Sequence, residues 1–337
     1  MKAFVVRQYA HPSKISLTLD APEPMQAKDT ILVDVYSAGL NFFDILQAQG
    51  KHQSKPPFPF ILGSEFAGVV VPGQVFPPGC PFKPGDRVFG SAPGCFAERV
   101  AARIDNLEPM PDTLSFDQAA GLYVTYPTSF EALDGRAKVQ PGEWVLVTAA
   151  AGGVGIAAVQ IAKALGAKVI AACSSSKLQV VRDWGRPDAV VDYTADGWQK
   201  QILHLTAGHG VDVVYDPVGR VRESLKCIAW NGRVLIVGFA GGTIESIPMN
   251  LVLLKNISLV GIHWGPYQEH DPERKREVWR RLLQLLAENR LPPVLYPTVF
   301  TLDTVVDGLA ELEARKTFGK VVMRVRDCAP PGASAKL

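Results

Sequence analysis

Cysteine is scarce in this chain and poorly spaced for its usual structural roles. The 337 residues include five cysteines, at positions 80, 95, 173, 227 and 328. No two of them form a C-x-x-C pair. An odd number without such pairs argues against a disulfide framework and against a structural zinc site. We therefore expect the protein to work in a reducing compartment.

The chain also lacks long apolar runs and an excess of charge of one sign. No stretch approaches the roughly eighteen uninterrupted apolar residues of a membrane span, and the N-terminal MKAFVVRQYA lacks the apolar core of a signal peptide. The 35 basic and 33 acidic residues leave a net charge of +2. The charged stretch Glu273–Arg276 is better explained as a solvated helix face than as a phosphate-binding patch. We expect no membrane association and no nucleic-acid partner.

The expected location is the cytoplasm, with the peroxisome as the alternative. The last three residues, Ala335-Lys336-Leu337, differ by one substitution from the S-K-L peroxisomal address.

What is present is a glycine-rich segment between two apolar runs, residues 144 to 177. Val145 to Thr148 predicts a buried strand, a helical pattern follows the glycines, and Lys168 to Ala172 predicts a second strand. Gly152 permits a tight turn, and Gly155 allows close packing of helix on strand. The helix N-terminus can then face a pyrophosphate. The spacing A-x-x-G-x-x-G is weak alone, but its setting between two strands predicts a dinucleotide-binding unit.

The end of the second strand favours NADPH over NADH. Units that bind NAD place an acidic residue about 20 positions beyond the glycine turn, where it bonds the ribose 2′-hydroxyl. Here that region holds Ser174, Ser175, Ser176 and Lys177. Hydroxyl groups and an ammonium group suit a 2′-phosphate.

Around this unit the chain predicts an α/β protein with two domains. The first 120 residues have turn signals every eight to twelve positions and indicate a mainly β region with one short helix in 38–50. Strands and helices then alternate, which indicates a doubly wound parallel sheet. Its expected strands are 145–149, 168–172, 189–191, 211–215, 233–237 and 257–263. Helices are expected at 177–182, 198–205, 221–229, 274–289 and 305–314, and a closing strand at 318–325.

The motifs together resemble the quinone oxidoreductase (zeta-crystallin-like) family of the medium-chain dehydrogenase/reductase superfamily. They cover nearly the whole chain and are AGLNFFDILQAQG, LGSEFAGVV, KPGDRVFG, GCFAERV, AAAGGVGIAAVQIAKALGAKVI, VDVVYDPVG, GRVLIVGFAGG and FGKVV. The resemblance implies a GroES-like β-rich domain from residues 1–124 and 266–337, a Rossmann domain from 125–265, and an active site between them. It also implies a homodimer, paired through an edge strand such as 257–263.

Departures from the family pattern concern zinc and the proton donor. Zinc-dependent relatives carry Cys where this chain has Asn41 and His where it has Ser64, and these are the ligands that zinc needs. Many quinone reductases carry tyrosines at the positions of Leu46 and His52. We therefore expect a zinc-independent enzyme whose proton donor is unassigned.

The resemblance also assigns candidate site residues. Asn41 and Asp44 fall on the substrate side, and His52 is a candidate proton donor, although an idle surface histidine is the alternative. Thr128 is expected at the nicotinamide, with a helix-capping threonine as the alternative, and Tyr193 at the adenosine phosphate, with a core aromatic as the alternative. The remaining expected cofactor contacts are Gly152, Gly153, Val154, Gly155, Ser174, Ser175, Lys177, Val218, Gly238, Phe239, Ala240 and Lys320.

The expected reaction is hydride transfer from NADPH to a small electron-poor acceptor. Without a zinc ion to polarise an alcohol or ketone, quinones and activated alkenes are the favoured substrates. Quinone reduction is preferred, because an enone or enoyl thioester also needs oxyanion donors and a proton source. The alternatives are an NADPH-dependent enone or enoyl-CoA reductase and a non-catalytic NADPH-binding protein, crystallin-like or RNA-binding.

Overall fold

The computed structural model describes residues 1–327, so the tripeptide Ala335-Lys336-Leu337 lies outside the described residues. The chain forms two compact units. Unit 1 joins Met1–Val124 to the segment from Leu295 onward, and unit 2 is Thr125–Val294. The predicted two-domain α/β class, with a GroES-like domain and a Rossmann-type parallel sheet, is confirmed.

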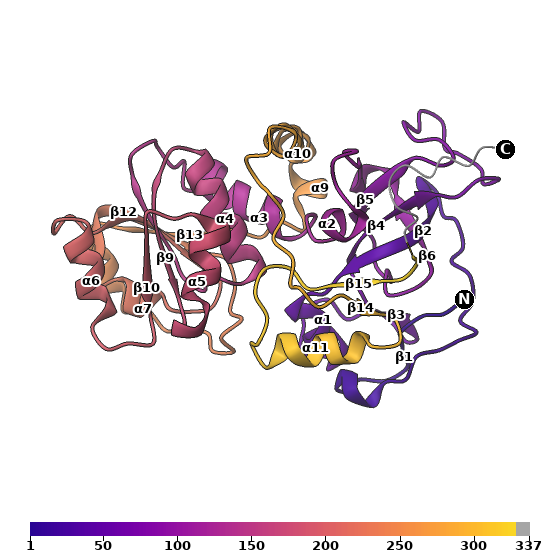
Figure 1. Cartoon of the computed structure of the whole chain (residues 1–337), viewed down its shortest axis with the longest axis horizontal. Helices are drawn as coiled ribbons and strands as arrows, with labels where there is room; N and C mark the ends of the chain where they lie inside the picture. The colour runs from indigo at the N-terminus through magenta and orange to yellow at the C-terminus, as the bar shows by residue number, and fades with distance from the viewer. Residues whose placement is uncertain (328–337) are drawn as a thin grey trace. The chain divides into compact units, whose positions relative to one another are not determined.

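Unit 1 is built around a mainly antiparallel seven-stranded sheet with the order β14-β15-β2-β4-β5-β7, in which β6 also pairs with β2 (Figure 1). A separate two-stranded sheet pairs β1 with β3. The strands are β1 (Val5–Val6), β2 (Thr30–Gly39), β3 (Phe60–Ile61), β4 (Glu65–Val70), β5 (Arg87–Ser91), β6 (Arg99–Arg103), β7 (Leu107–Pro109), β14 (Phe300–Thr301) and β15 (Val322–Arg324).

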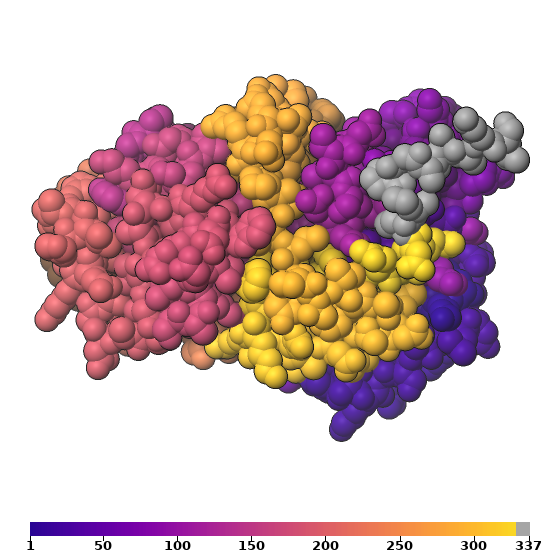
Figure 2. Space-filling view, in the orientation of Figure 1, coloured from indigo at the N-terminus to yellow at the C-terminus, as the bar shows by residue number. Residues whose placement is uncertain are grey.

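The longest strand of unit 1, β2, shows why the sheet forms. Ile31, Val33 and Val35 alternate along it and are completely buried in the apolar core, as expected for a strand with one covered face. The helices are α1 (Phe42–Ala48), α2 (Phe116–Ala120) and α11 (Val305–Glu313). Helix α11 buries Val305 and Leu309, and its outer face lies on the surface in Figure 2.

Unit 2 has a six-stranded, fully parallel sheet with the order β10-β9-β8-β11-β12-β13. Counted from the first strand, this is the 3-2-1-4-5-6 order of a dinucleotide-binding fold. The strands are β8 (Trp144–Val147), β9 (Lys168–Cys173), β10 (Ala189–Asp192), β11 (Val211–Asp216), β12 (Ile228–Ile236) and β13 (Ser258–Gly261).

Helices cover both faces of this sheet (Figure 1). Side chains of α6, α7 and α8 pack with alternate strand residues such as Leu146 and Ile170, whereas α4 contacts β8 and β9. The helices of unit 2 are α3 (Thr125–Phe130), α4 (Gly153–Ala164), α5 (Leu178–Val180), α6 (Trp198–Leu205), α7 (Val221–Ser224), α8 (Met249–Lys255), α9 (Tyr267–His270) and α10 (Pro272–Ala287). No helix within residues 1–327 is both long enough and apolar enough to cross a membrane.

The second crossing between the units lies later than the sequence predicted. Residues 266–294 were expected in the GroES-like domain, but they belong to unit 2. Helix α10 packs on α3 and buries Trp279 and Leu282, and ion pairs add to this packing. Arg274 of α10 bonds Glu131 at 2.7 Å and Asp134 at 2.6 Å. Arg281 bonds Asp134 at 2.7 Å. This part of the charged helix is therefore held in ion pairs and is not simply a solvated face.

A second difference concerns the segment 221–236. The sequence predicted a helix over 221–229 and a strand over 233–237, whereas α7 ends at Ser224 and β12 starts at Ile228. Asn231 adopts a left-handed conformation with φ 63°, which asparagine tolerates well. The pairing of β12 with β11 jumps here from Ile228 with Val211 to Arg233 with Val213, so the residues between form an irregularity and regular pairing resumes at Arg233.

Candidate functional site

The glycine turn of unit 2 joins β8 to α4 and is closely packed. A Cβ atom on Gly155 would lie 2.3 Å from the Ala149 carbonyl oxygen, so only glycine fits there. Gly152 is the N-cap of α4 with φ −74°, and a Cβ there would meet nothing closer than 3.5 Å. The left-handed residue of the turn is therefore Ala149, with φ 47°, and the tight-turn role predicted for Gly152 is wrong.

The expected cofactor residues of unit 2 gather at one edge of the sheet. Each follows the carboxyl end of a strand or lies in the first turn of the next helix, and in a parallel sheet these ends share one edge, where ligands bind. They are Gly152, Gly153, Val154 and Gly155 after β8, Ser174, Ser175 and Lys177 after β9, Tyr193 after β10, Val218 after β11, and Gly238, Phe239 and Ala240 after β12.

Two of these loops are tied to each other. The Ala240 N–H group donates to the Pro217 oxygen at 3.1 Å, and the Gly241 N–H group donates to the Val218 oxygen at 3.0 Å. A Cβ on Gly241 would lie 2.3 Å from that Val218 oxygen. The loops after β11 and β12 thus form one surface.

The loop after β11 is organised by Asp216, which sequence analysis did not select. Its buried carboxylate accepts from the Thr148 hydroxyl at 2.5 Å and from the N–H groups of Gly219 at 3.0 Å and Arg220 at 2.7 Å. It therefore joins the ends of β8 and β11. The sequence Asp-Pro-Val-Gly-Arg directly after an apolar strand is the signal that could have identified Asp216.

Thr128 lies half-buried on α3, beside a chain of buried hydroxyl groups. Ser129 Oγ lies 2.9 Å from the Tyr215 hydroxyl and 3.0 Å from the Val154 carbonyl oxygen. Burial raises the pKa of Tyr215 well above its ordinary value, so this phenol is a neutral hydrogen-bonding group. These contacts hold α3 against the first turn of α4, and they fix Thr128 relative to the glycine turn.

In unit 1, the predicted Asn41 and Asp44 meet Glu65 and Lys320 in a buried polar cluster. Lys320 Nζ lies 2.5 Å from Glu65 Oε1 and 2.6 Å from Asn41 Oδ1. Asn41 Nδ2 donates to Glu65 Oε1 at 2.9 Å, and the Val124 N–H group donates to Glu65 Oε2 at 2.9 Å. The sequence analysis placed Lys320 among cofactor contacts, but the structure commits its ammonium group to this cluster.

Asp44 is completely buried at the edge of the cluster. Its Oδ2 accepts from the Asn41 N–H group at 2.8 Å, and its Oδ1 has no hydrogen-bond partner among the described residues. Burial raises the pKa of Asp44 to about 7, although the Asn41 N–H group and the Lys320 charge act in the opposite direction. Near neutral pH a large fraction of Asp44 is therefore an uncharged carboxylic acid.

His52 lies in the expected polar loop. Its ring stands 5.7 Å from the Phe43 ring, and its Nδ1 accepts from the Ser54 N–H group at 3.2 Å. These contacts do not bring it to Asn41, Asp44 or Lys320.

The residues of this cluster do not suit zinc. Zinc needs thiolate, imidazole or free carboxylate ligands, whereas the Glu65 carboxylate here is bonded to an ammonium group and an amide. Burial raises the pKa of the Cys95 thiol, which keeps it protonated, and its sulfur contacts the Glu65 carbonyl oxygen at 3.2 Å. Nowhere within residues 1–327 do three or more His, Cys, Asp or Glu side chains come together in a way that could hold a metal ion.

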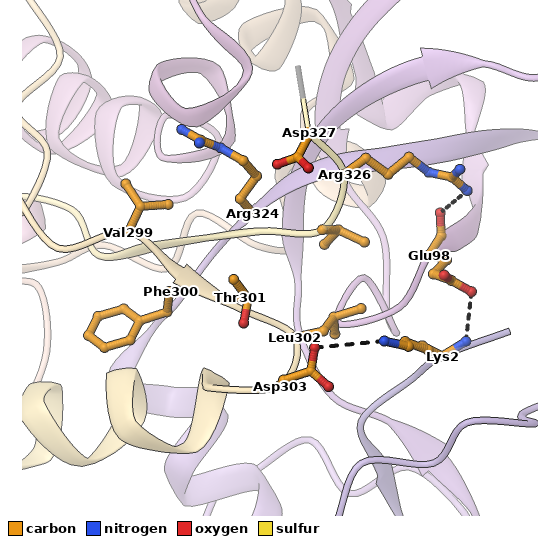
Figure 3. Close-up of a pocket in the computed structure, with 11 residues that line it drawn as sticks. Lys2, Glu98, Val299, Phe300, Thr301, Leu302, Asp303, Arg324, Arg326 and Asp327 are labelled. Atoms are coloured by element: carbon orange, nitrogen blue, oxygen red, sulfur yellow. Dashed lines mark hydrogen bonds and ion pairs between the residues drawn. The ribbon is translucent and has the colours of Figure 1, made fainter. Parts of the chain in front are cut away.

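A depression of about 300 Å³ on unit 1 is not part of either site. Figure 3 shows its lining, in which Lys2 is joined to Asp303 and Glu98, and Glu98 to Arg326. Of these contacts Lys2–Asp303 is an ion pair, whereas the Lys2 backbone N–H group donates to the Glu98 carboxylate and Arg326 donates to the Glu98 carbonyl oxygen. No predicted site residue lines the hollow, and we assign it no ligand.

Comparison with known proteins agrees with this architecture. Residues 27–126 match the family model "Alcohol dehydrogenase GroES-like domain", and residues 153–288 match "Zinc-binding dehydrogenase".

Individual relatives are similar over most of the chain. A quinone oxidoreductase-like protein 2 homologue of Nematostella vectensis is 40% identical over 88% of this chain and 82% of its own. The quinone oxidoreductase of Thermus thermophilus, solved also as its NADPH complex, is 33% identical with a TM-score of 0.83, over 96% of this chain and all (100%) of its own. A reducing polyketide synthase of Gibberella fujikuroi is 33% identical over 91% of this chain, but only 13% of its own length is matched. The chain therefore belongs to the quinone oxidoreductase family of the medium-chain dehydrogenase/reductase superfamily.

Proposed function

We propose that this protein is a zinc-independent oxidoreductase that uses NADPH to reduce quinones. The observation that carries the cofactor assignment is the end of β9. Cys173 closes the strand, and Ser174, Ser175 and Lys177 follow at the sheet edge where an NAD-binding protein would present a carboxylate. The NADPH complex of the Thermus thermophilus relative supports the same assignment.

One carboxylate does stand nearby, on the next strand, and it is already engaged. Asp192 at the end of β10 accepts from the Thr194 N–H group at 2.8 Å and from the Thr194 hydroxyl at 2.6 Å. Those hydrogen bonds lower the pKa of Asp192. The Asp192 carboxylate is therefore engaged in the local turn. This favours Ser174, Ser175 and Lys177 as the groups that face the ribose.

When bound, NADPH supplies the hydride. The first turn of α4 would hold the pyrophosphate with backbone N–H groups, and the Gly155 contact keeps that turn close to the sheet. Thr128, fixed through Ser129 and the Val154 carbonyl, would orient the nicotinamide end.

We infer the class of hydride acceptor from the buried polar cluster around Glu65 and Lys320 in unit 1. The pairing of Glu65 with Lys320 leaves no ligand set for a Lewis-acidic metal, so a substrate has to accept hydride without one. A quinone does this readily, because conjugation spreads the incoming charge over the ring. We place the substrate oxygen next to Asn41 and Lys320, which are hydrogen-bonded within the cluster but are not completely buried.

Reduction of an activated alkene is the second candidate. The similarity to the reducing polyketide synthase favours it, and the acidic proton of a neutral Asp44 would be a nearby proton source. The two functions differ in the acceptor that is turned over.

The decisive experiment follows NADPH oxidation with quinones, enones, enoyl-CoA thioesters and aldehydes as separate acceptors. We expect the quinones to give the highest kcat/KM. Turnover of an enone or thioester without quinone turnover would reverse the order of the two candidates. NADPH binding without any turnover would contradict both.

We also propose that two copies of the chain associate through unit 2. Strand β13 stands at the edge of the sheet, where β12 is the one strand that pairs with it among residues 1–327. The neighbouring helix α8 exposes Met249, Leu253 and Leu254, with 69%, 77% and 68% of their surfaces accessible. An open strand edge beside an apolar helix face is a surface that a second copy can cover.

A further inference from the structure

Arg220 makes contacts that its sequence position did not reveal. Its guanidinium carbon lies 4.2 Å from the centre of the Tyr193 ring. Its Nη1 donates to the Tyr193 carbonyl oxygen at 3.3 Å and to Glu223 Oε2 at 2.9 Å. A guanidinium over an aromatic face, tied also to the backbone of the same residue, holds ring and cation as one unit.

Further hydrogen bonds connect this pair to the end of β9. The Tyr193 N–H group donates to the Cys173 carbonyl oxygen at 3.1 Å, and the Lys177 N–H group donates to the Ser174 oxygen at 2.9 Å. The Arg220 backbone is fixed separately, because its N–H group donates to Asp216 at 2.7 Å. Arg220 is thus held by Asp216 and by Tyr193, and Tyr193 is bonded to the end of β9, from which the serines and Lys177 follow.

The free part of the guanidinium is suited to a phosphate. Only Nη1 makes hydrogen bonds to described residues, and 30% of the side chain is accessible. The Nε–Nη2 edge is therefore left as a planar pair of donors. Such a fork matches two phosphate oxygens better than a single ammonium group does.

We propose that Arg220 is a specificity-determining residue that binds the 2′-phosphate of NADPH, together with Ser174 and Lys177. The Tyr193 ring lies against the face of the guanidinium, and Glu223 holds Nη1. The inference rests on the proposed use of NADPH and adds a cation that the strand-end motif does not contain.

A purely structural role for Arg220 makes a different prediction. Glu223 also accepts from Trp198 Nε1 at 3.3 Å, so Arg220 belongs to a network that packs α6 and α7. If that were its whole contribution, its loss would affect NADPH and NADH equally.

The test measures the dissociation constants of NADPH and NADH for the wild type and for Arg220→Ala, Arg220→Lys and Arg222→Ala. Arg222 is the matched control, because it lies two residues further on, in α7, which Arg220 caps. Its side chain is exposed and takes part in no ion pair within the described residues. Arg220→Lys keeps the cation but removes the fork, and it remains informative if the alanine variant folds poorly.

We expect Arg220→Ala to weaken NADPH binding by about tenfold to a hundredfold, as for loss of charge-assisted hydrogen bonds. Arg220→Lys should give an intermediate loss. NADH binding should change less than about threefold in both variants, and Arg222→Ala should match the wild type for both cofactors.

Equal losses for the two cofactors, or no loss of NADPH binding, would overturn the role of Arg220 while leaving NADPH use intact. A wild-type protein that binds NADPH no better than NADH would instead contradict the proposed cofactor, and this inference with it.

Discussion

At the scale of single residues, the pair Glu65–Lys320 is the most consequential contact of unit 1. Both groups are nearly inaccessible, and their atoms approach to 2.5 Å. Burying two charges costs much of what their attraction returns, but removing one partner leaves a buried charge unpaired. Replacing Lys320 by methionine should therefore lower the free energy of unfolding by about 3–5 kcal/mol.

Chemical denaturation of the wild type, of Lys320→Met and of the double variant Lys320→Met/Glu65→Gln measures this loss of stability. Lys320→Met alone should be strongly destabilised, while the double variant with Glu65→Gln should recover most of the loss, because the unpaired charge is gone. A single variant as stable as the wild type would show that the pair is not buried in solution.

Asp44 gives a pH-dependent prediction. Because burial raises its pKa from 3.8 to about 7, the folded protein keeps a proton that the unfolded chain releases. The stabilisation is fully present below about pH 4 and is lost as the pH rises toward 7. Over this window the wild type should lose up to about 4 kcal/mol relative to Asp44→Asn, which mimics the neutral acid at every pH.

Measuring both unfolding free energies from pH 4 to pH 8 isolates this group, since other titrations cancel in the difference. The difference should change with pH up to about 7 and level off above it. Parallel curves would mean that Asp44 is ionised in the folded protein.

At the scale of the element, cofactor binding by the glycine turn depends on how tightly the turn is packed. Gly155→Ala would place a methyl group 2.3 Å from the Ala149 oxygen and 2.9 Å from the Ala150 Cα, so the backbone has to move. We expect a loss of about 1–3 kcal/mol in stability and at least about tenfold weaker NADPH binding, since the shifted turn no longer aims its N–H groups.

Gly152→Ala is the matched control for this prediction. A methyl group there meets only ordinary contacts, at 3.5 Å, and the backbone is in a region that alanine adopts. Thermal unfolding should therefore change little in this variant. If Gly155→Ala melted at the wild-type temperature, the tight packing at the turn would be refuted.

The sequence predicted elements well where periodicity and local chemistry decide them. The strands of the parallel sheet, helix α10 and the turn before α4 all follow from apolar spacing and glycine. What it could not supply were contacts between distant positions. Lys320 and Glu65 are far apart in the sequence, as are Arg220 and Tyr193, and no periodicity relates them.

Local preferences also misled where tertiary contacts were stronger. The segment up to 229 was expected to be helical, but Ile228 pairs with Val211 of β11. Residues 266–294 join unit 2 because α10 packs on α3 with its apolar face buried. Arg274 and Arg281 add ion pairs with Glu131 and Asp134. In both cases the deciding partner lies outside any window of sequence.

At the scale of the whole molecule, the association of two copies can be tested by charge. Leu253→Lys with Leu254→Lys places two cations on the exposed face of α8 and should convert a dimer to a monomer, because unpaired charges are costly to bury. Sedimentation velocity measures the change. Leu19→Lys, at a leucine of unit 1 with 66% of its surface accessible, is the control and should leave the mass unchanged. A wild type that sediments as a monomer would contradict the proposed interface.

The central claim is that this chain reduces quinones with NADPH and without a metal. The most direct measurement is the steady-state rate of NADPH oxidation by a quinone, using protein dialysed against a strong chelator and checked for zinc by elemental analysis. The account predicts full activity with far less than one zinc per chain, and a much lower kcat/KM with NADH. Activity that disappears with the chelator and returns with added zinc would contradict it.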